Sequence, residues 1–313
     1  MTEPMSQTIY LPKRLVKPPI RLVLDSSIVF GLGEKNWKFL EDLTEAKKIQ
    51  AWDSVVGLCE IICHVHKSDS PEHHDAKWLA NRCANLARIT PNHMLPSPGV
   101  VVSRALREWL KWPKTARIEE SKIFLRIRKK LIDQPSFLKS NEIRAAIVEP
   151  TDTVEKSFCR SLESLREELK KDYVVKAQST VSPNQFREMI IGYIQRKPEF
   201  QSSLFCHFMN HHNVGIEAMA AIALKWREIP YVADLMSIYN LQIGNFIAHS
   251  RKAEFSDFLD FELAAYIASN HIDFFVTNNK RDFQEAFKYY APLANKVLSW
   301  EDFKKRMESS NGR

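Results

Sequence analysis

A short run of apolar residues near the start of the chain predicts a buried strand. Ile20 to Leu24 is almost continuously apolar and rich in branched side chains, a pattern typical of strands covered on both faces of a parallel sheet. Asp25 ends the run, and Ser26 and Ser27 then offer an N-cap for a following helix. Asp25 is therefore expected at the carboxyl end of a central strand, where open α/β sheets bind their ligands.

The residues after this strand predict a helix, a further short element and a second helix. The first helix is expected over residues 36–48, and a strand or helix start near Ala51–Val56. A mostly apolar segment, Gly57 to His64, follows. This pattern puts Glu60 on the second helix, from which its carboxylate could reach the edge of the sheet.

Residues 67–249 have a helical pattern, with prolines marking the boundaries between helices. The clearest helices are expected at Glu155–Lys171, which is strongly charged, and at Gly215–Trp226, which is nearly all apolar on one side. Neither segment carries a reaction motif. We therefore expect this part of the chain to be a large, all-helical insertion.

The last part of the chain returns to alternating helices and strands. A helix is expected over Asp257–Ala268, a strand over Ile272–Val276 and a last strand near Lys296–Trp300. A right-handed crossover between parallel strands would bring Thr277 to the same sheet edge as Asp25.

The two ends of the chain are thus expected to build one domain. Residues 1–66 and 250–313 would form an α/β unit around a single parallel sheet, with the insertion of residues 67–249 between them.

Acidic residues stand at several of the predicted strand ends and helix starts. Asp25, Glu60, Asp282 and the pair Asp257 and Asp260 could all reach one sheet edge, and the i, i+3 spacing of the pair lets one helical face present both. Mg²⁺ and Mn²⁺ prefer carboxylate oxygens, and such a cation polarises a phosphate and lowers the pKa of a bound water. The pattern favours a metal site for phosphodiester cleavage.

Three segments resemble motifs of the PIN-domain nucleases. LDSSIV at residues 24–29 is similar to the opening motif of that family, and Glu60 falls where the family places its second acid. DFLDFELAAY at residues 257–266 and FFVTNNKRDF at residues 274–283 resemble the family's third-acid helix and its closing Thr-x-Asp or Thr-x-Asn turn. The resemblance covers roughly the first 65 and the last 65 residues.

The resemblance implies a three-layer α/β/α fold and a Mg²⁺- or Mn²⁺-dependent nuclease, often acting on RNA, with frequent roles as a toxin or in RNA processing. A regulatory protein such as an antitoxin is then a possible partner. Asn279 stands where many members carry Asp, which leaves Asp282 to act as the fourth acid. Ser26, Thr277 and Asn279 would support the ligands or contact phosphate. The span from Glu60 to Asp257 is far longer than in the compact toxins of the family.

The charge of the chain favours a polyanionic partner such as nucleic acid, and the resemblance to PIN-domain nucleases implies RNA more than DNA. Lys and Arg exceed Asp and Glu by 45 − 38 = 7, which attracts nucleic acid before any specific contact forms. Ten basic and three acidic residues between residues 104 and 130 give that segment the same excess, 10 − 3 = 7. The side chains expected to contact nucleic acid are Lys111, Lys114, Arg126, Arg128, Lys129 and Lys130. Trp109 and Trp112 could stack on bases, although core packing is the alternative role.

Cysteines and histidines offer a weaker alternative chemistry. Cys59, Cys63 and His66, or His207 and His211, could be zinc ligands on a helix, but neither set completes a four-ligand spacing. The five cysteines are odd in number and irregularly spaced, which is typical of reduced, buried thiols. No apolar run suits a signal peptide or a membrane span, so a cytoplasmic protein is expected.

Three hypotheses follow from the sequence. The first is a metal-dependent endonuclease, preferentially an endoribonuclease, in which Asp25, Glu60, Asp260 and Asp282 hold the cation. The second is a catalytically inactive nucleic-acid-binding or scaffold protein that has lost its metal because Asn279 replaces an acid. The third makes the insertion a protein-interaction module on a sheet platform.

Overall fold

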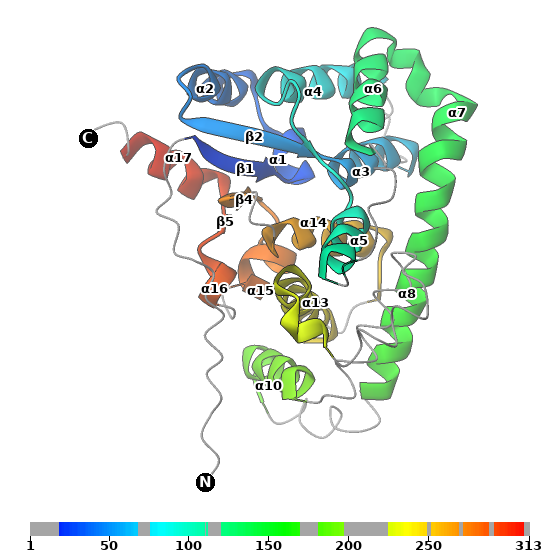
Figure 1. The fold of residues 1–313 in the computed structure, drawn as a ribbon, viewed down its shortest axis with the longest axis vertical. Coiled ribbons are helices and arrows are strands. Elements are labelled where there is room, and N and C mark those ends of the chain that lie inside the picture. Colours follow the sequence, from blue (N-terminus) through cyan, green and yellow to red (C-terminus); the bar gives the residue numbers. More distant parts are fainter. Residues whose placement is uncertain are drawn as a thin grey trace.

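The computed structural model describes residues 19–67, 76–109, 111, 120–169, 181–196, 225–248, 252–268, 272–287 and 291–309. Within this part of the chain, five parallel strands form one sheet in the order β3-β2-β1-β4-β5 (Figure 1). The strands are β1 (Ile20–Leu24), β2 (Ile49–Ser54), β3 (Met94–Leu95), β4 (Phe274–Val276) and β5 (Val297–Leu298).

The pairing of β1 joins the two ends of the chain. Val23 pairs with Trp52 of β2 on one side, and Leu24 pairs with Val276 of β4 on the other. The prediction that both ends contribute to one parallel sheet is confirmed. Because the strands run parallel, the residues that follow β1 and β4 emerge at the same edge.

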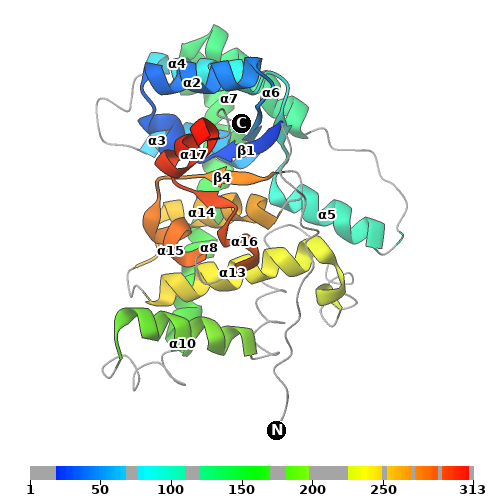
Figure 2. The ribbon, with the colours of Figure 1, turned by 90° about the vertical axis from the view of Figure 1, so that its left-hand side faces the viewer.

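Successive side chains of β1 point to opposite faces of the sheet. Leu22 and Leu24 join one hydrophobic core, whereas Val23 joins a second core on the other face. Helices cover both faces of the sheet (Figure 2), as expected for strands that are buried on both sides.

The first core is covered by helices from both the first and the middle part of the chain. These are α2 (Glu34–Glu45), α3 (Val55–Lys67), α4 (Ala76–Ile89), α6 (Glu120–Asp133) and α17 (Trp300–Ser309), with the short α1 (Ser26–Gly31) and α7 (Asn141–Ile143) beside them. The apolar stripe of α2 shows the principle, because Trp37, Leu40 and Leu43 recur at helical spacing and are all buried.

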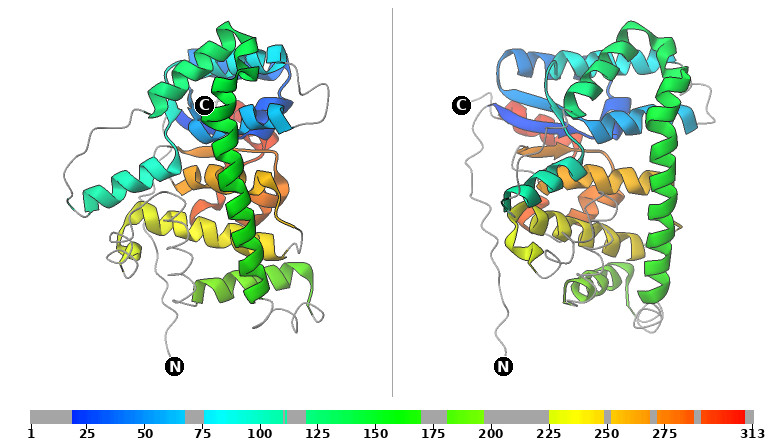
Figure 3. Two further views of the ribbon diagram at one scale, coloured as in Figure 1. Left: turned by 90° about the vertical axis from the view of Figure 1, so that its right-hand side faces the viewer. Right: turned by 45° about the vertical axis from the view of Figure 1, so that its right-hand side comes forward.

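The second core is covered by α5 (Pro98–Trp109), α8 (Glu149–Leu169), α10 (Pro183–Arg196), α13 (Pro230–Ala248) and α14 (Phe255–Ala265), with α15 (Glu285–Phe287) and α16 (Ala291–Ala294). In Figures 1 and 3, α8 runs along one side of the molecule from α7, past α3 and α14, to α10. Among the described helices, none is long and apolar enough to cross a membrane.

The prediction of an all-helical insertion is wrong. Strand β3 lies within residues 67–249 yet pairs with β2 as part of the sheet, and a strand of two residues is too short to leave a periodic signal. The helices of this segment also share the two cores of the sheet. The segment is therefore built into the α/β unit. The helix expected at residues 215–226 lies almost wholly outside the described residues.

Candidate active site

Asp25 lies directly after β1, and its carboxylate is held by two hydroxyl groups. Ser27 Oγ donates to Asp25 Oδ2 at 2.5 Å, and Thr277 Oγ1 donates to the same oxygen at 2.6 Å. The Asp25 amide donates to the carbonyl of Val276 at 2.9 Å, which ties the ends of β1 and β4 together. The predicted meeting of Asp25 and Thr277 is confirmed.

The start of α1 differs from the prediction in one respect. Ser26 and Ser27 belong to the first turn of the helix, and Asp25 occupies the N-cap position without a side-chain capping hydrogen bond. The carboxylate of Asp25 is thus directed to the hydroxyl groups at the sheet edge. It is 2% exposed, and burial raises the pKa of Asp25, while the hydrogen bonds from Ser27 and Thr277 oppose that shift.

The turn after β4 is closed by its own side chains. The amide of Asn279 donates to Thr277 Oγ1 at 2.9 Å, and the amide of Asn278 donates to Ser27 Oγ at 3.2 Å. Asn279 Oδ1 accepts from the amide of Asp282 at 3.1 Å, so this side chain caps the helical turn η7 (Lys280–Gln284). Thr277 supports Asp25 directly, whereas Asn279 fixes the backbone of the turn.

Glu60, on α3, reaches the sheet edge next to Asp25. Its Oε1 accepts a hydrogen bond from Ser26 Oγ at 2.6 Å. Its Oε2 is shielded from solvent and has no hydrogen-bond partner among the described residues. Burial, and next to it the charge of Asp25, raises the pKa of Glu60 to about 8. A buried carboxylate oxygen without a donor is costly in the absence of a proton or a cation.

Asp260 brings a third acid from a third element, α14. It is 8% exposed. Burial is the main cause that holds the pKa of Asp260 well above its usual range, followed by the charges of Glu60 and Asp25. Asp25, Glu60 and Asp260 are thus close enough to disfavour each other's ionised forms, as in other sites where carboxylates are gathered.

The two remaining predicted acids have partners of their own. Asp257 Oδ2 accepts a hydrogen bond from the amide of Glu254 at 2.6 Å, which fixes the start of α14. Asp282 is held by the guanidinium of its neighbour Arg281, with two Nε contacts at 3.0 and 3.1 Å and an Nη2 contact at 2.9 Å. Both acids are buried, and both add smaller contributions to the raised pKa of Asp260.

The three central acids offer ligands that suit a hard divalent cation, because Mg²⁺ and Mn²⁺ prefer carboxylate oxygens. Glu60 Oε2 has no hydrogen-bond partner among the described residues and could coordinate such a cation. As they stand, however, no three His, Cys, Asp or Glu side chains of the described residues are arranged to hold one metal ion. Cys59, Cys63 and His66, the alternative zinc ligands, do not form a metal site among the described residues either. The ring Nε2 of His66 instead lies 2.8 Å from the carbonyl oxygen of Leu138. His207 and His211 lie outside the described residues.

Glu155 is an acid near this site that the sequence reading did not select. It lies on α8 and is 1% exposed, and its charge contributes to the raised pKa of Glu60. The spacing of residues in the sequence could have identified it, because Glu155 lies three residues before Phe158 and seven before Leu162, on the face of α8 that is buried. An acid on the apolar stripe of a helix is unusual enough to be noted.

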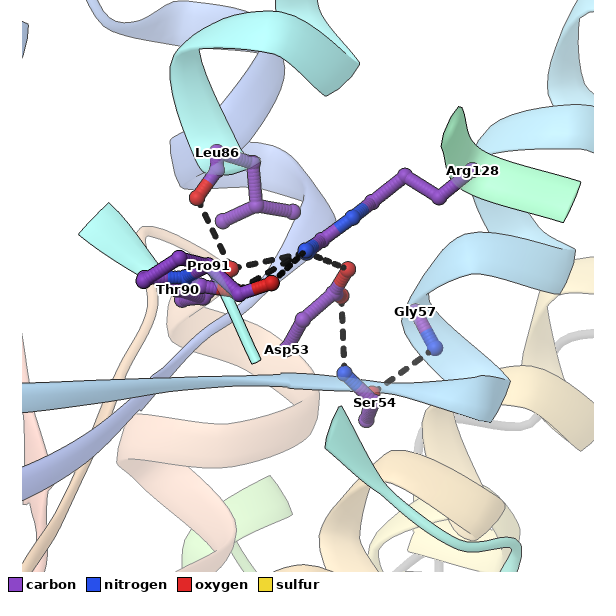
Figure 4. Close-up of polar contacts among 7 residues, drawn as sticks. All are labelled: Asp53, Ser54, Gly57, Leu86, Thr90, Pro91 and Arg128. Carbon is purple, nitrogen blue, oxygen red and sulfur yellow. Dashed lines mark hydrogen bonds and ion pairs between the residues drawn. The ribbon is translucent and has the colours of Figure 1, made fainter. Parts of the chain in front are cut away.

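The predicted nucleic-acid contact at Arg128 is contradicted. Its side chain is 3% exposed and forms a buried ion pair with Asp53 of β2, in which Nη1 lies 2.8 Å from Oδ2 (Figure 4). Nη1 also donates to Thr90 Oγ1 at 2.7 Å, and Nη2 donates to the Thr90 carbonyl at 2.8 Å. Arg128 therefore joins α6 to the sheet instead of facing solvent.

The other predicted basic contacts have different surroundings. Arg126 and Lys129 are exposed on α6 and line a shallow pocket of about 370 Å³ between α4 and α6. Lys130 is exposed but pairs with Glu142 at 3.2 Å, and Lys111 is exposed after α5. Lys114 and Trp112 lie outside the described residues, whereas Trp109 packs against the second core.

Comparisons of the chain with protein-family models, with characterised proteins and with solved structures gave no match.

Proposed function

We propose that this chain is a metal-dependent phosphodiesterase of the nuclease class, acting on RNA in preference to DNA. One observation carries the proposal: Asp25, Glu60 and Asp260 come from three separate elements and lie close enough for their charges to interact beside the carboxyl end of β1, with Asp25 and Asp260 buried and Glu60 half-buried. Open α/β sheets bind their ligands at this edge. The resemblance of the flanking segments to PIN-domain nucleases agrees with the same chemistry.

The raised pKa values of the three acids favour a divalent cation as their partner. Gathering carboxylates in a buried place costs free energy, and a cation between them would remove much of that cost. When bound, Mg²⁺ or Mn²⁺ would polarise the phosphate and lower the pKa of a water. As described, no three of these side chains form a ready metal site, so the carboxylates would have to move closer together around a bound cation.

The surrounding residues have distinct tasks in this proposal. Asp25 is oriented by Ser27 and Thr277, and Glu60 is oriented by Ser26. Such hydrogen bonds keep ligand carboxylates in a fixed geometry. Asp282 would need to leave Arg281 before it could bind a cation, so we assign the main ligand roles to Asp25, Glu60 and Asp260.

The basic surface of α6 would hold the phosphate backbone of the substrate. Arg126 and Lys129 are the exposed cations that line its pocket, and contacts of this kind position a nucleic acid without reading its sequence. Arg128 is excluded from this role by its burial.

A second candidate is an inactive nucleic-acid-binding or scaffold protein. Two observations favour it: the described acids do not form a ready metal site, and the Asn279 side chain is used to cap η7. Binding of RNA without metal-dependent turnover would be its signature.

A cleavage assay distinguishes the two candidates. Purified parent, Asp25→Asn and Asp260→Asn would be incubated with labelled single-stranded RNA and DNA in Mn²⁺, Mg²⁺ or EDTA. The nuclease proposal expects metal-dependent cutting of RNA and a loss of about 1,000-fold in each variant, since a bound cation contributes several kcal/mol to the transition state. Glu45→Gln, which removes an exposed acid at the end of α2 shortly before the start of β2, is the matched control and should cut like the parent. Tight RNA binding without cutting in any metal would establish the scaffold instead.

A further inference from the structure

The pocket between α4 and α6 has an apolar wall. Its volume is about 370 Å³, within the range of roughly 300–1,000 Å³ that holds small organic ligands. Ala87 of α4 and Leu125 and Ile132 of α6 line the pocket and are half-buried. Leu125 and Ile132 stand two helical turns apart, on one side of α6. Together they offer an apolar surface to a group of matching shape.

Three polar side chains surround this apolar wall. Arg126 and Lys129 are exposed about one turn apart on α6, and Asn92 is exposed in the loop before β3; all three line the pocket. Among the described residues, none of these three side chains has a hydrogen-bond or ion-pair partner. Two cations and one amide are therefore available to a ligand in the pocket.

Arg128 fixes the loop that forms one side of the pocket. Its Nη2 donates to the carbonyl of Thr90 at 2.8 Å and to that of Pro91 at 3.4 Å (Figure 4), and its Nη1 is held by Asp53. Pro91 further restricts the backbone directly before Asn92. The pocket is thus formed before a ligand arrives, and a preformed site loses less conformational entropy on binding.

This combination of groups suits a nucleotide. Two neighbouring cations on a helix match a phosphate group, and the apolar wall can cover the face of a base. The amide of Asn92 offers both a donor and an acceptor to the edge of a base. An inorganic anion would use the cations alone and leave the apolar wall uncovered.

The pocket lies apart from the acids at the sheet edge. Pro91 and Asn92 precede β3, whereas Asp25 follows β1, and β2 lies between these two strands. A nucleotide in the pocket is therefore not the one that meets Asp25. It would hold the strand while another part of the same strand reaches the acids.

We propose that this pocket binds one unstacked nucleotide of an RNA strand, with its phosphate at Arg126 and Lys129 and its base between the apolar wall and Asn92. The choice of RNA rests on the proposed function. Proteins that recognise single-stranded RNA commonly bind bases that have left the stack. The pocket would thus favour single-stranded over paired substrates.

Isothermal titration calorimetry of the full chain in EDTA tests the pocket without relying on cleavage. The probes are adenosine monophosphate, inorganic phosphate and a short single-stranded RNA. Ala87→Phe fills the pocket without changing its charge, and we expect it to weaken binding of the mononucleotide and of the RNA at least about 10-fold each. Ala84→Phe, the same change one turn earlier on α4 at a residue that does not line the pocket, is the matched control and should bind both like the parent.

A second variant keeps the test decisive if Ala87→Phe does not fold. Asn92→Ala changes an exposed loop residue, so the fold should tolerate it. It should weaken binding of the mononucleotide while binding of inorganic phosphate stays unchanged, because only the contact with the base is lost.

The other outcomes overturn the inference in distinguishable ways. If Ala87→Phe binds the mononucleotide and the RNA like the parent, the pocket is not a nucleotide site. If only mononucleotide binding weakens, the ligand is a free nucleotide and the assignment to an RNA strand is wrong. If oligoglutamate of equal charge displaces the RNA, the cations attract any polyanion. A parent that binds RNA through the pocket but cleaves it in no metal would leave this site standing while the nuclease proposal falls.

Discussion

Two neighbouring strands of the sheet, β1 and β2, each have an aspartate at the carboxyl end, and the surroundings of the two aspartates are opposite in charge. Asp53, at the end of β2, is buried with the guanidinium of Arg128. Asp25, after β1, is buried with hydroxyl groups and with the like charges of Glu60 and Asp260. A buried charge that has its counter-ion within the chain serves the fold. A buried charge without one is unfavourable for folding, and under the proposed function a bound cation would compensate it.

The largest effect is expected from removing the internal counter-ion. Arg128→Ala leaves Asp53 uncompensated in the interior, and breaking one side of a buried ion pair costs about 3–5 kcal/mol. The free energy of unfolding, measured by urea denaturation, should fall by that amount. Asp53→Leu combined with Arg128→Met removes both charges and should recover most of the loss. An Arg128→Ala protein as stable as the parent would contradict a structural role for the pair.

At the acid cluster, charge is expected to destabilise the metal-free fold, whereas the charges of Arg128 and Asp53 stabilise it. With a pKa of about 8 for Glu60 against an ordinary value of 4.5, the folded state holds a proton between those pH values that the unfolded chain has released. Stability therefore falls as the pH rises through that window, by at least about 1 kcal/mol between pH 5 and pH 8. Asp260 has a raised pKa as well and adds to the same trend.

Glu60→Gln sharpens this prediction. The variant should lose part of the pH dependence and be more stable than the parent at pH 8, as measured by urea denaturation in EDTA at several pH values. Stability that rises with pH in the parent would mean that Glu60 is ionised and compensated in the fold, as Asp53 is.

The smallest effect is expected at Lys129, the exposed neighbour of Arg128. Lys129→Ala should change the free energy of unfolding by less than about 0.5 kcal/mol, because the side chain is at the surface. It should weaken RNA binding independently of sequence and lower the slope of log affinity against log salt by about 1. Filter binding at several salt concentrations measures this slope. An unchanged slope would remove α6 from the RNA-binding surface.

The central part of the site could be predicted because it depends on short-range patterns and one topological rule. The apolar run before Asp25 and the one before Thr277 each indicate a strand, and parallel strands end at one edge. These two facts are sufficient to bring the two residues together, although they are 252 positions apart. Glu60 and Asp260 could be assigned to helices because apolar helical segments follow β2 and precede β4 along the chain.

The burial of the Arg128 and Glu155 side chains could not be predicted from the sequence in the same way. The segment around Arg128 has many cations, and only its pairing with Asp53, 75 positions earlier, shows which one is buried. Glu155 lies in a charged helix whose rotation is set by aromatic contacts with α14. Strand β3 was missed because two residues carry no periodicity. In each case the decisive information is a tertiary contact with a distant element.

The hydrogen bond between Thr277 and Asp25 also has a consequence for synthesis of the protein. The first acid of the site is made early, but the hydroxyl that holds it and the strand that flanks it come 252 residues later. During translation, β1 must wait for β4 until the long segment between them has left the ribosome. The hydrogen-bonded arrangement around Asp25 therefore cannot form on a nascent chain that has not yet reached Thr277.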